Sequence, residues 1–180
     1  MNVCVFCGSG TGTKPVFSEA ARKLGTLFGR SSVRLVYGGG KIGLMGIMAS
    51  AVMDAGGEVT GVIPRFLLER EVGHSGITTL EIVESMHQRK KRMAELADAF
   101  IGLPGGWGTL EELCEILTWK QLQLITQPVL LLNTAHFFDP LLQQMRLMVR
   151  EGFLASGNFD FLQVDNTPEK IFSLLTSAQD

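Results

Sequence analysis

Short apolar runs alternate along the chain with longer segments in which apolar residues recur every three or four positions. Apolar runs of about 4–8 residues favour buried strands, and the three-to-four periodicity favours amphipathic helices. The expected strands are Asn2–Phe6, Val33–Tyr37, Glu58–Ile63, Thr78–Val83, Ala99–Leu103, Pro128–Asn133 and Phe161–Val164. The expected helices cover residues 16–30, 43–55, 86–97, 109–124, 138–151 and 168–177.

This order of elements predicts an α/β protein with a mostly parallel sheet and helices on both faces. Because crossovers between parallel strands are right-handed, the chain should form a doubly wound, Rossmann-like fold. No linker, low-complexity tract or internal repeat interrupts the pattern, so residues 1–180 are expected to form a single domain. The least regular segment, Arg65–Ile77, is expected to be a loop that covers the site at the sheet edge.

Composition and charge narrow the function classes. With 46% hydrophobic residues the chain can bury a core, which excludes a wholly disordered protein. The net charge is −2, so nucleic-acid binding driven by charge is not expected. Apolar stretches such as Val129–Leu132 are far shorter than the ~20 residues of a membrane-spanning helix. Met1 leads straight into a strand without a basic leader, so we expect a cytoplasmic protein that binds no membrane.

The cysteines and histidines do not favour redox or metal chemistry. Cys4 and Cys7 form a C-x-x-C pattern, but the pattern lies along a predicted strand. Strand residues three apart point to opposite faces of the sheet, which makes a disulfide between them difficult. The three histidines form no zinc-type spacing with each other or with cysteine, so we expect no metal site.

Three predicted strands end in glycine-rich loops. Glycine lets the backbone turn sharply and approach a ligand closely, and ligands of doubly wound folds bind beyond the carboxyl ends of the strands. Three such loops at one sheet edge therefore favour an anionic, phosphorylated ligand. The loops are Cys7-Gly8-Ser9-Gly10-Thr11-Gly12, Gly38-Gly39-Gly40-Lys41-Ile42-Gly43 and Pro104-Gly105-Gly106-Trp107-Gly108-Thr109.

A dinucleotide site is an alternative, because Gly38, Gly40 and Gly43 satisfy G-x-G-x-x-G. That fingerprint usually follows the first strand and is paired with an acidic residue that closes the second. Here it follows the second strand, and the candidate Glu58 opens the next strand instead of ending one. The first loop has Thr13 where the third glycine would stand. A nicotinamide-dependent oxidoreductase is therefore weakly supported.

The helix predicted over residues 86–97 carries two cations on its apolar side. Helical-wheel positions place Arg89 and Lys90 there, whereas Lys91 and Arg92 fall on the opposite, solvated face. Burying unpaired charge is costly, so Arg89 and Lys90 should meet a carboxylate or a bound phosphate. The apolar residues of this side are Met86, Met93, Leu96 and Ala97.

The helix after the third glycine loop separates two adjacent glutamates. Glu111 aligns with Glu115 and Thr118 on a polar face, so solvent exposure is expected. Glu112 lies on a mostly apolar edge close to the glycine loop, where a carboxylate is placed for general-base or electrostatic work. The apolar stripe of the helix is Leu110, Leu113, Leu117 and Leu124, and the edge of Glu112 contains Thr109, Ile116 and Trp119.

These residues resemble the LONELY GUY (LOG) family of nucleoside-monophosphate phosphoribohydrolases over residues 2–135. Pro104–Glu112 matches P-G-G-x-G-T-x-x-E, Met86–Lys90 matches M-H-x-R-K, and Tyr37–Gly46 matches Y-G-G-G-x-x-G-L-M-G. Val5–Ser9 also fits the opening of the family. Gly10-Thr11-Gly12 departs from it, because relatives often have a second serine or a similar polar residue there.

The resemblance implies hydrolysis of the N-glycosidic bond of AMP-like nucleotides, including N6-prenylated cytokinin nucleotides, to a free base and ribose 5-phosphate. It implies that Arg89 and Glu112 are catalytic. It also implies a nucleotide-binding domain, a homodimer, and no metal or cofactor. The residues that it implies for substrate binding are Gly8, Ser9, Gly38, Gly39, Gly40, Met86, Lys90, Pro104, Gly105, Gly106, Trp107, Gly108 and Thr109.

A carrier of a phosphorylated pterin is the alternative from a different class. Molybdenum-cofactor carriers share the fold and have similar glycine loops, but the presence of both Arg89 and Glu112 favours an enzyme. No lysine is marked as a pyridoxal anchor, so a decarboxylase is not supported. The preference between AMP and its prenylated relatives stays open at this point.

Overall fold

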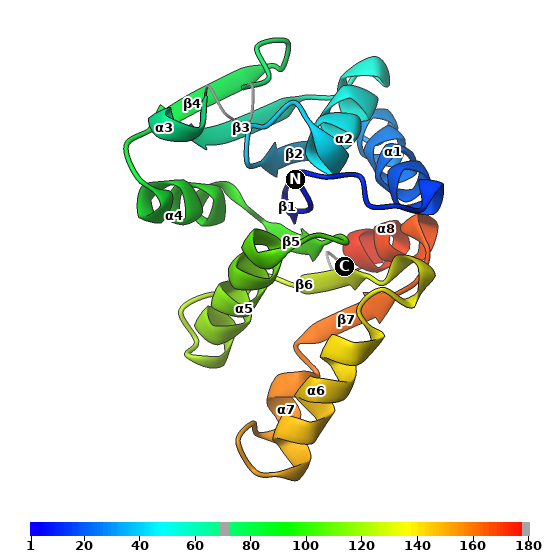
Figure 1. Cartoon of the computed structure of the whole chain (residues 1–180), viewed down its shortest axis with the longest axis vertical. Coiled ribbons are helices and arrows are strands. Elements are labelled where there is room, and N and C mark those ends of the chain that lie inside the picture. Colours follow the sequence, from blue (N-terminus) through cyan, green and yellow to red (C-terminus); the bar gives the residue numbers. More distant parts are fainter. Residues whose placement is uncertain (69–72, 178–180) are drawn as a thin grey trace.

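The computed structural model describes residues 1–68 and 73–177, and its centre is a seven-stranded sheet. All pairings between neighbouring strands are parallel, in the order β4-β3-β2-β1-β5-β6-β7. The predicted doubly wound α/β fold is confirmed (Figure 1). The strands are β1 (Asn2–Phe6), β2 (Arg34–Tyr37), β3 (Val59–Pro64), β4 (Thr79–Val83), β5 (Ala99–Gly102), β6 (Val129–Leu132) and β7 (Leu162–Asp165).

Helices cover both faces of this sheet. Residues of α1, α2 and α8 pack in the apolar core on one face, and residues of α4, α5 and α6 pack in the core on the other (Figure 1). The helices are α1 (Pro15–Arg30), α2 (Gly43–Asp54), α3 (Arg65–Leu68), α4 (Met86–Leu96), α5 (Trp107–Gln121), α6 (Asp139–Arg150), α7 (Ser156–Phe159) and α8 (Pro168–Ser177), with a 3-10 turn at Thr134–His136. No helix in the described ranges has the length and apolar character to span a membrane.

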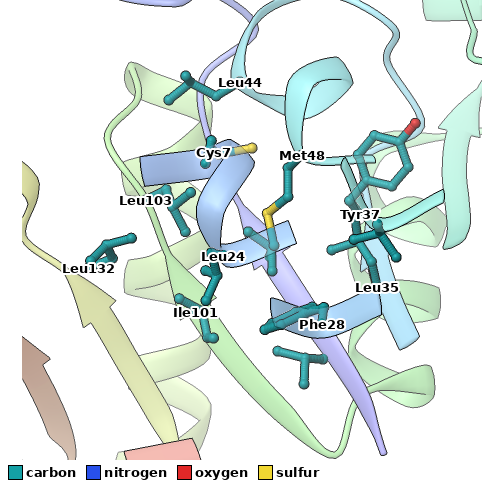
Figure 2. Packing of buried hydrophobic residues seen from close by; sticks show 14 of the residues in the cluster. Cys7, Leu24, Phe28, Leu35, Tyr37, Leu44, Met48, Ile101, Leu103 and Leu132 are labelled. Atoms are coloured by element: carbon teal, nitrogen blue, oxygen red, sulfur yellow. The ribbon is translucent and has the colours of Figure 1, made fainter. Parts of the chain in front are cut away.

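Strand β1 shows how the two cores divide the chain. Alternate side chains along β1 and the residue that follows it point to opposite faces, so Cys7, just after β1, packs with α1 and α2 while Cys4 packs with α4 and α5. The prediction that these cysteines face apart is confirmed, and both are free thiols. Figure 2 shows Cys7 near Met48 and Leu44 in the first core, together with Leu24 and Phe28 of α1.

Helix α5 differs from the sequence prediction at both ends. Helix α5 begins at Trp107, two residues before the predicted start, because Gly106 takes the N-cap position. It ends at Gln121, and Gln123 adopts a positive φ of 58°. Leu124 was expected on the apolar stripe of this helix, which is wrong: it lies beyond the helix and is 67% exposed. A left-handed residue stops the helix before its apolar pattern stops.

The segment Arg65–Ile77 is more ordered than predicted where the structure describes it. It starts with the single-turn helix α3, and Gly73 forms an isolated antiparallel bridge with Gly40. Residues 69–72 of this predicted loop lie outside the described residues. A helix of one turn leaves no repeated apolar spacing, which is why periodicity does not reveal it.

The chain order places a crevice between β1 and β5. From β1 the sheet grows outward through β2, β3 and β4, and the chain then returns to form β5 on the other side of β1. The connections that leave β1 and β5 therefore run to opposite faces of the sheet. Such a switch point, at the carboxyl ends of the strands, is where doubly wound folds bind ligands.

Candidate active site

A cavity of about 170 Å³ lies at this switch point, between α4 and α5. Its wall comes from the loops after β1, β2 and β5 and from the two helices. The predicted site residues that line it are Gly8, Ser9, Gly38, Met86, Arg89, Gly106, Trp107, Gly108, Thr109 and Glu112. The structure thus brings together both predicted catalytic residues and eight of the predicted substrate-binding residues.

Arg89 is held in the wall of this cavity by backbone carbonyl groups. Helix α4 begins at Met86 because the Ser85 hydroxyl accepts a hydrogen bond from the Gln88 amide at 3.2 Å, a standard N-cap. One turn later Arg89 is 94% buried, and its Nε donates to the Val62 carbonyl at 3.2 Å. This bond holds the guanidinium at the edge of the sheet.

Glycine at position 38 makes room for this arginine. Arg89 Nη2 donates to the Gly38 carbonyl at 2.9 Å, and a Cβ on residue 38 would lie 1.9 Å from the same nitrogen. Any larger side chain would therefore displace the guanidinium. Gly38, which also belongs to the G-x-G-x-x-G pattern, is therefore required here to make room for Arg89.

Lys90 points away from the cavity toward α5. It lines the outer groove between α4 and α5, where Nζ forms ion pairs with Glu111 and with Glu115, the latter at 3.2 Å. Burial lowers the pKa of Lys90, but the hydrogen bonds to the two carboxylates outweigh burial and raise it. The expectation that Lys90 meets an anion is confirmed, and the anion is a carboxylate pair of the chain.

The remaining cations of α4 differ from each other. Lys91 is exposed, as predicted. Arg92, also predicted to be solvated, keeps 40% of its side chain exposed, and it binds Glu81 of β4 through Nε at 2.7 Å and Nη2 at 3.0 Å. This ion pair was not predicted, because Glu81 lies on the edge strand that packs beside α4 and a helical wheel contains no information about neighbouring elements.

The N-terminus of α5 forms one end of the cavity. Its N-cap, Gly106, has no capping side chain, so the amide groups of the first turn, at residues 107–109, are open to a ligand. Among the described residues, no atom lies within 4 Å of where a Cβ on Gly106 or Gly108 would stand, so packing does not require glycine there. Free amides and the positive end of the helix dipole together favour an anion.

Gly105 and Thr109 fit closely behind this turn. A Cβ on Gly105 would lie 2.1 Å from Thr109 Oγ1, and Thr109 itself is buried. The Gly8 amide donates to the Pro104 carbonyl at 3.1 Å, which ties the first glycine loop to the third. Glycine at 105 therefore serves packing, whereas the glycines on either side of Trp107 leave open space.

Glu112 and Glu111 both line the cavity, in different ways. Glu112 is half-buried, and its charge acts on the thiols of Cys4 and Cys7: burial raises the pKa of Cys7, the negative charge of Glu112 raises it further, and Arg89 opposes this. Glu112 and Arg89 thus act on one point at the end of β1. Glu111 is 54% exposed, as expected, and stands at the rim in its ion pair with Lys90.

A second cavity, of about 290 Å³, adjoins the first across the ridge formed by Gly8, Ser9 and Gly106. Pro104 and Gly105 line this second cavity together with the aromatic residues Phe17 and Phe137. The loop Gly10-Thr11-Gly12, which departs from the family pattern, forms its outer wall.

Gly39 and Gly40 take structural positions in the second loop. Both are buried, Gly39 has a φ of +78°, and its carbonyl accepts a hydrogen bond from the His74 amide at 3.0 Å. Met45 and Met93 line the first cavity although neither was a predicted site residue. Met45 lies within the G-L-M-G element, which is the signal that would have identified it; Met93 was interpreted only as core.

The fold and this cavity define a Rossmann-like protein with an uncapped helix N-terminus beside a buried arginine and a carboxylate. A family model described as "Possible lysine decarboxylase" matches residues 45–175. Cytokinin riboside 5'-monophosphate phosphoribohydrolase LOG of Oryza sativa subsp. japonica is 50% identical over 153 residues, 85% of this chain and 63% of that protein. The chain thus spans less than two thirds of the length of this relative.

Two further relatives are covered more fully. Arabidopsis thaliana LOG2, named a cytokinin riboside 5'-monophosphate phosphoribohydrolase, is 48% identical over 86% of this chain and 72% of its own length. A Rhodococcoides fascians protein with the same enzyme name is 48% identical over 85% of this chain and 78% of its own. The chain therefore belongs to the LOG family.

Solved structures agree on the fold. The molybdenum cofactor binding protein of Rippkaea orientalis superposes with a TM-score of 0.75 at 20% identity, covering 99% of this chain and 97% of that one. The Moco carrier protein of Chlamydomonas reinhardtii superposes with a TM-score of 0.74 at 17% identity, covering 99% of this chain and 96% of that one. At these identities the likeness extends to the fold alone.

Proposed function

We propose that this protein hydrolyses the N-glycosidic bond of nucleoside 5'-monophosphates, both cytokinin nucleotides and AMP, to a free base and ribose 5-phosphate. The observation that carries the proposal is the single cavity that holds Arg89, Glu112 and the open N-terminus of α5. Family relatives named for this reaction on cytokinin riboside 5'-monophosphate support it.

The N-terminus of α5 supplies the phosphate site. The free amides of residues 107–109 donate to phosphate oxygens, and the helix dipole favours their charge. The open space at Gly106 and Gly108 lets the phosphate approach the backbone directly. A 5'-phosphate held there places the sugar between the glycine ridge and the first turns of α5.

Glu112 acts on the sugar carbon that carries the base. As the glycosidic bond breaks, its electrons leave with the base and positive charge develops on the ring, which a nearby carboxylate stabilises. The same carboxylate orients a water molecule that adds to C1', and a proton from that water compensates the charge of the departing base. Arg89, fixed by the Val62 and Gly38 carbonyls, orients the nucleotide beside Glu112.

The description of the family model as a lysine decarboxylase does not fit the lysine of this site. A lysine that forms a Schiff base needs a lowered pKa and access to the substrate. Lys90 has a raised pKa, and its ammonium is occupied by Glu111 and Glu115 on the outer side of α4. Its role is to join α4 to α5.

Product analysis tests the proposal. The purified protein is incubated with AMP, N6-isopentenyladenosine monophosphate and adenosine, and free base and ribose 5-phosphate are quantified by chromatography. Both nucleotides should yield base and sugar phosphate in equal amounts. Adenosine should be cleaved far more slowly, because each lost charge-assisted hydrogen bond to phosphate costs ~1.5–3 kcal/mol.

Two results would contradict the proposal. Equal kcat/KM for AMP and adenosine would show that a phosphate site does not contribute to the reaction. Absence of base release from either nucleotide, with a folded protein, would reject the enzyme and favour a carrier of a phosphorylated ligand.

A further inference from the structure

The most exposed large apolar side chain at the catalytic cavity is that of Trp107. Its relative exposure is 89%, although it is the first residue of α5 and borders the cavity that holds Arg89 and Glu112. Indole carries a large apolar surface that is normally buried. An indole left in water at the entrance of a polar cavity therefore has no role in packing the chain.

The local backbone keeps both faces of this indole accessible. Trp107 stands between Gly106 and Gly108, which add no side chains beside it. One turn further along the same helix face is Glu111, at the rim of the cavity and drawn toward Lys90. The rim formed by Trp107 and Glu111 is thus flat, aromatic and open at one end.

A bound nucleotide would reach this rim with its base. If the 5'-phosphate binds the amides of residues 107–109 and C1' lies beside Glu112, the sugar fills the cavity between the glycine ridge and α4. The inner wall is closed by Met86, Met93 and the buried Arg89. The base must then leave the cavity on its open side, where Trp107 stands.

We propose that the indole of Trp107 is the platform on which the base of the bound nucleotide stacks. This inference rests on the proposed function and assigns to the side chain a task separate from that of the residue 107 amide. Stacking accepts any flat ring, and the overlap grows with ring area. The platform therefore selects purine over pyrimidine nucleotides and tolerates substitution at the N6 edge of the ring.

The fluorescence of the Trp107 indole reports directly on stacking at this platform. The chain has two tryptophans, Trp107 and Trp119, and Trp119 lies about 18 Å along α5 from Trp107 at 1.5 Å per residue. In a Trp119→Phe protein all indole emission comes from Trp107, and stopped-flow mixing records it before turnover. AMP should quench this emission with saturation, whereas ribose 5-phosphate should not. The matched Trp107→Phe protein, which emits from Trp119, should not respond to AMP.

Calorimetry with ribose 5-phosphate as the ligand without a base separates stacking from phosphate binding. Trp107→Leu keeps the backbone and an apolar side chain but removes the ring. This variant should bind AMP ~10–100-fold more weakly, the usual scale for one stacked base. Its affinity for ribose 5-phosphate should change by less than about twofold. Trp107→Phe should restore most of the AMP affinity. Equal weakening of both ligands, or unchanged AMP affinity in Trp107→Leu, would overturn the proposal.

The stacking proposal and the proposed function fail in different ways. If AMP quenches Trp107 but no adenine is released, hydrolysis is rejected and the platform remains. If Trp107→Leu, folded by thermal melting, cleaves AMP with the wild-type kcat/KM, hydrolysis remains and the platform is rejected.

Discussion

The two faces of the sheet are built from different kinds of contact. On one face α1 and α2 pack through apolar and small residues, and Gly25 of α1 lies so close to α2 that a Cβ would be 2.7 Å from the Met48 carbonyl oxygen. On the other face α4 carries three cations that bind different parts of the protein. Both faces have an apolar core, but only the second also places charged side chains at the cavity.

The cations of α4 show how a short sequence produces this charged face. A helix turns by about 100° per residue, so neighbouring residues point in different directions. Arg89 reaches the carbonyls after β2 and in β3, Lys90 reaches α5, and Arg92 reaches β4. Each contact constrains α4 and thereby the position of Arg89. A charged face of this kind depends on the apolar face for stability, because desolvating charge offsets much of what ion pairs contribute.

The largest effect on the charged face is expected from Arg89→Ala. The change removes the cation proposed to orient the nucleotide and leaves the Val62 and Gly38 carbonyls without the Arg89 donor, so kcat/KM for AMP should fall by ~100–1,000-fold. Arg89→Lys should restore only part of this, because an ammonium cannot reproduce a planar fork. Steady-state kinetics with Arg92→Ala as the control measures the difference. A larger loss in Arg92→Ala would show that α4 is wrongly oriented.

On the apolar face, substitution should change stability and leave catalysis intact. Gly25→Val inserts a branched side chain where a Cβ alone would lie 2.7 Å from a backbone oxygen. The free energy of unfolding should therefore fall by ~1–3 kcal/mol. The control is Gly157→Val, since within the described part of the chain no atom lies within 4 Å of a Cβ there. Urea unfolding and kinetics at 25 °C test both. A Gly25→Val protein of unchanged stability would refute the close packing of α1 on α2.

The smallest effect concerns the ion pair between Arg92 and Glu81. The hydrogen bonds from Arg92 hold the pKa of the Glu81 carboxyl below its ordinary value. The pair therefore contributes stability above the unfolded pKa of about 4.3, and the contribution is lost as pH falls through the lower folded pKa. Glu81→Gln should lower the free energy of unfolding by at most ~1 kcal/mol at neutral pH, since both groups are partly exposed.

Urea unfolding of wild type and Glu81→Gln as a function of pH tests this sign. The difference between them should shrink toward zero as pH falls below the folded pKa of Glu81. A difference that grows on acidification would show that Glu81 is not stabilised by its partner.

Most of the fold was predictable because it depends on local patterns. The bounds of β1 match the prediction and no other strand end differs by more than one residue, since apolar runs bounded by turn residues determine the strands. Arg89 was also predicted to be buried, because its place on an apolar helix side is visible in the spacing. The resemblance to a family then placed it in the site.

The remaining features depend on contacts between distant parts of the chain. Arg89 meets carbonyls 27 and 51 residues away, and the need for Gly38 follows from that contact. The partner of Arg92 lies on a neighbouring strand, and the exposure of Leu124 follows from a left-handed residue that ends α5 early. Wheel arithmetic describes one helix and contains no information about what packs against it.

The catalytic role of Glu112 is tested most directly by comparing it with its neighbour. Glu112→Gln keeps the shape of the side chain and removes its charge, so AMP should still bind while turnover falls by ~100–10,000-fold. Glu111→Gln is the matched control: it faces the rim and Lys90, and its turnover should stay within a few-fold of the parent. Adenine release and AMP affinity are measured on both proteins after thermal melting confirms folding. Wild-type turnover in folded Glu112→Gln would contradict the account.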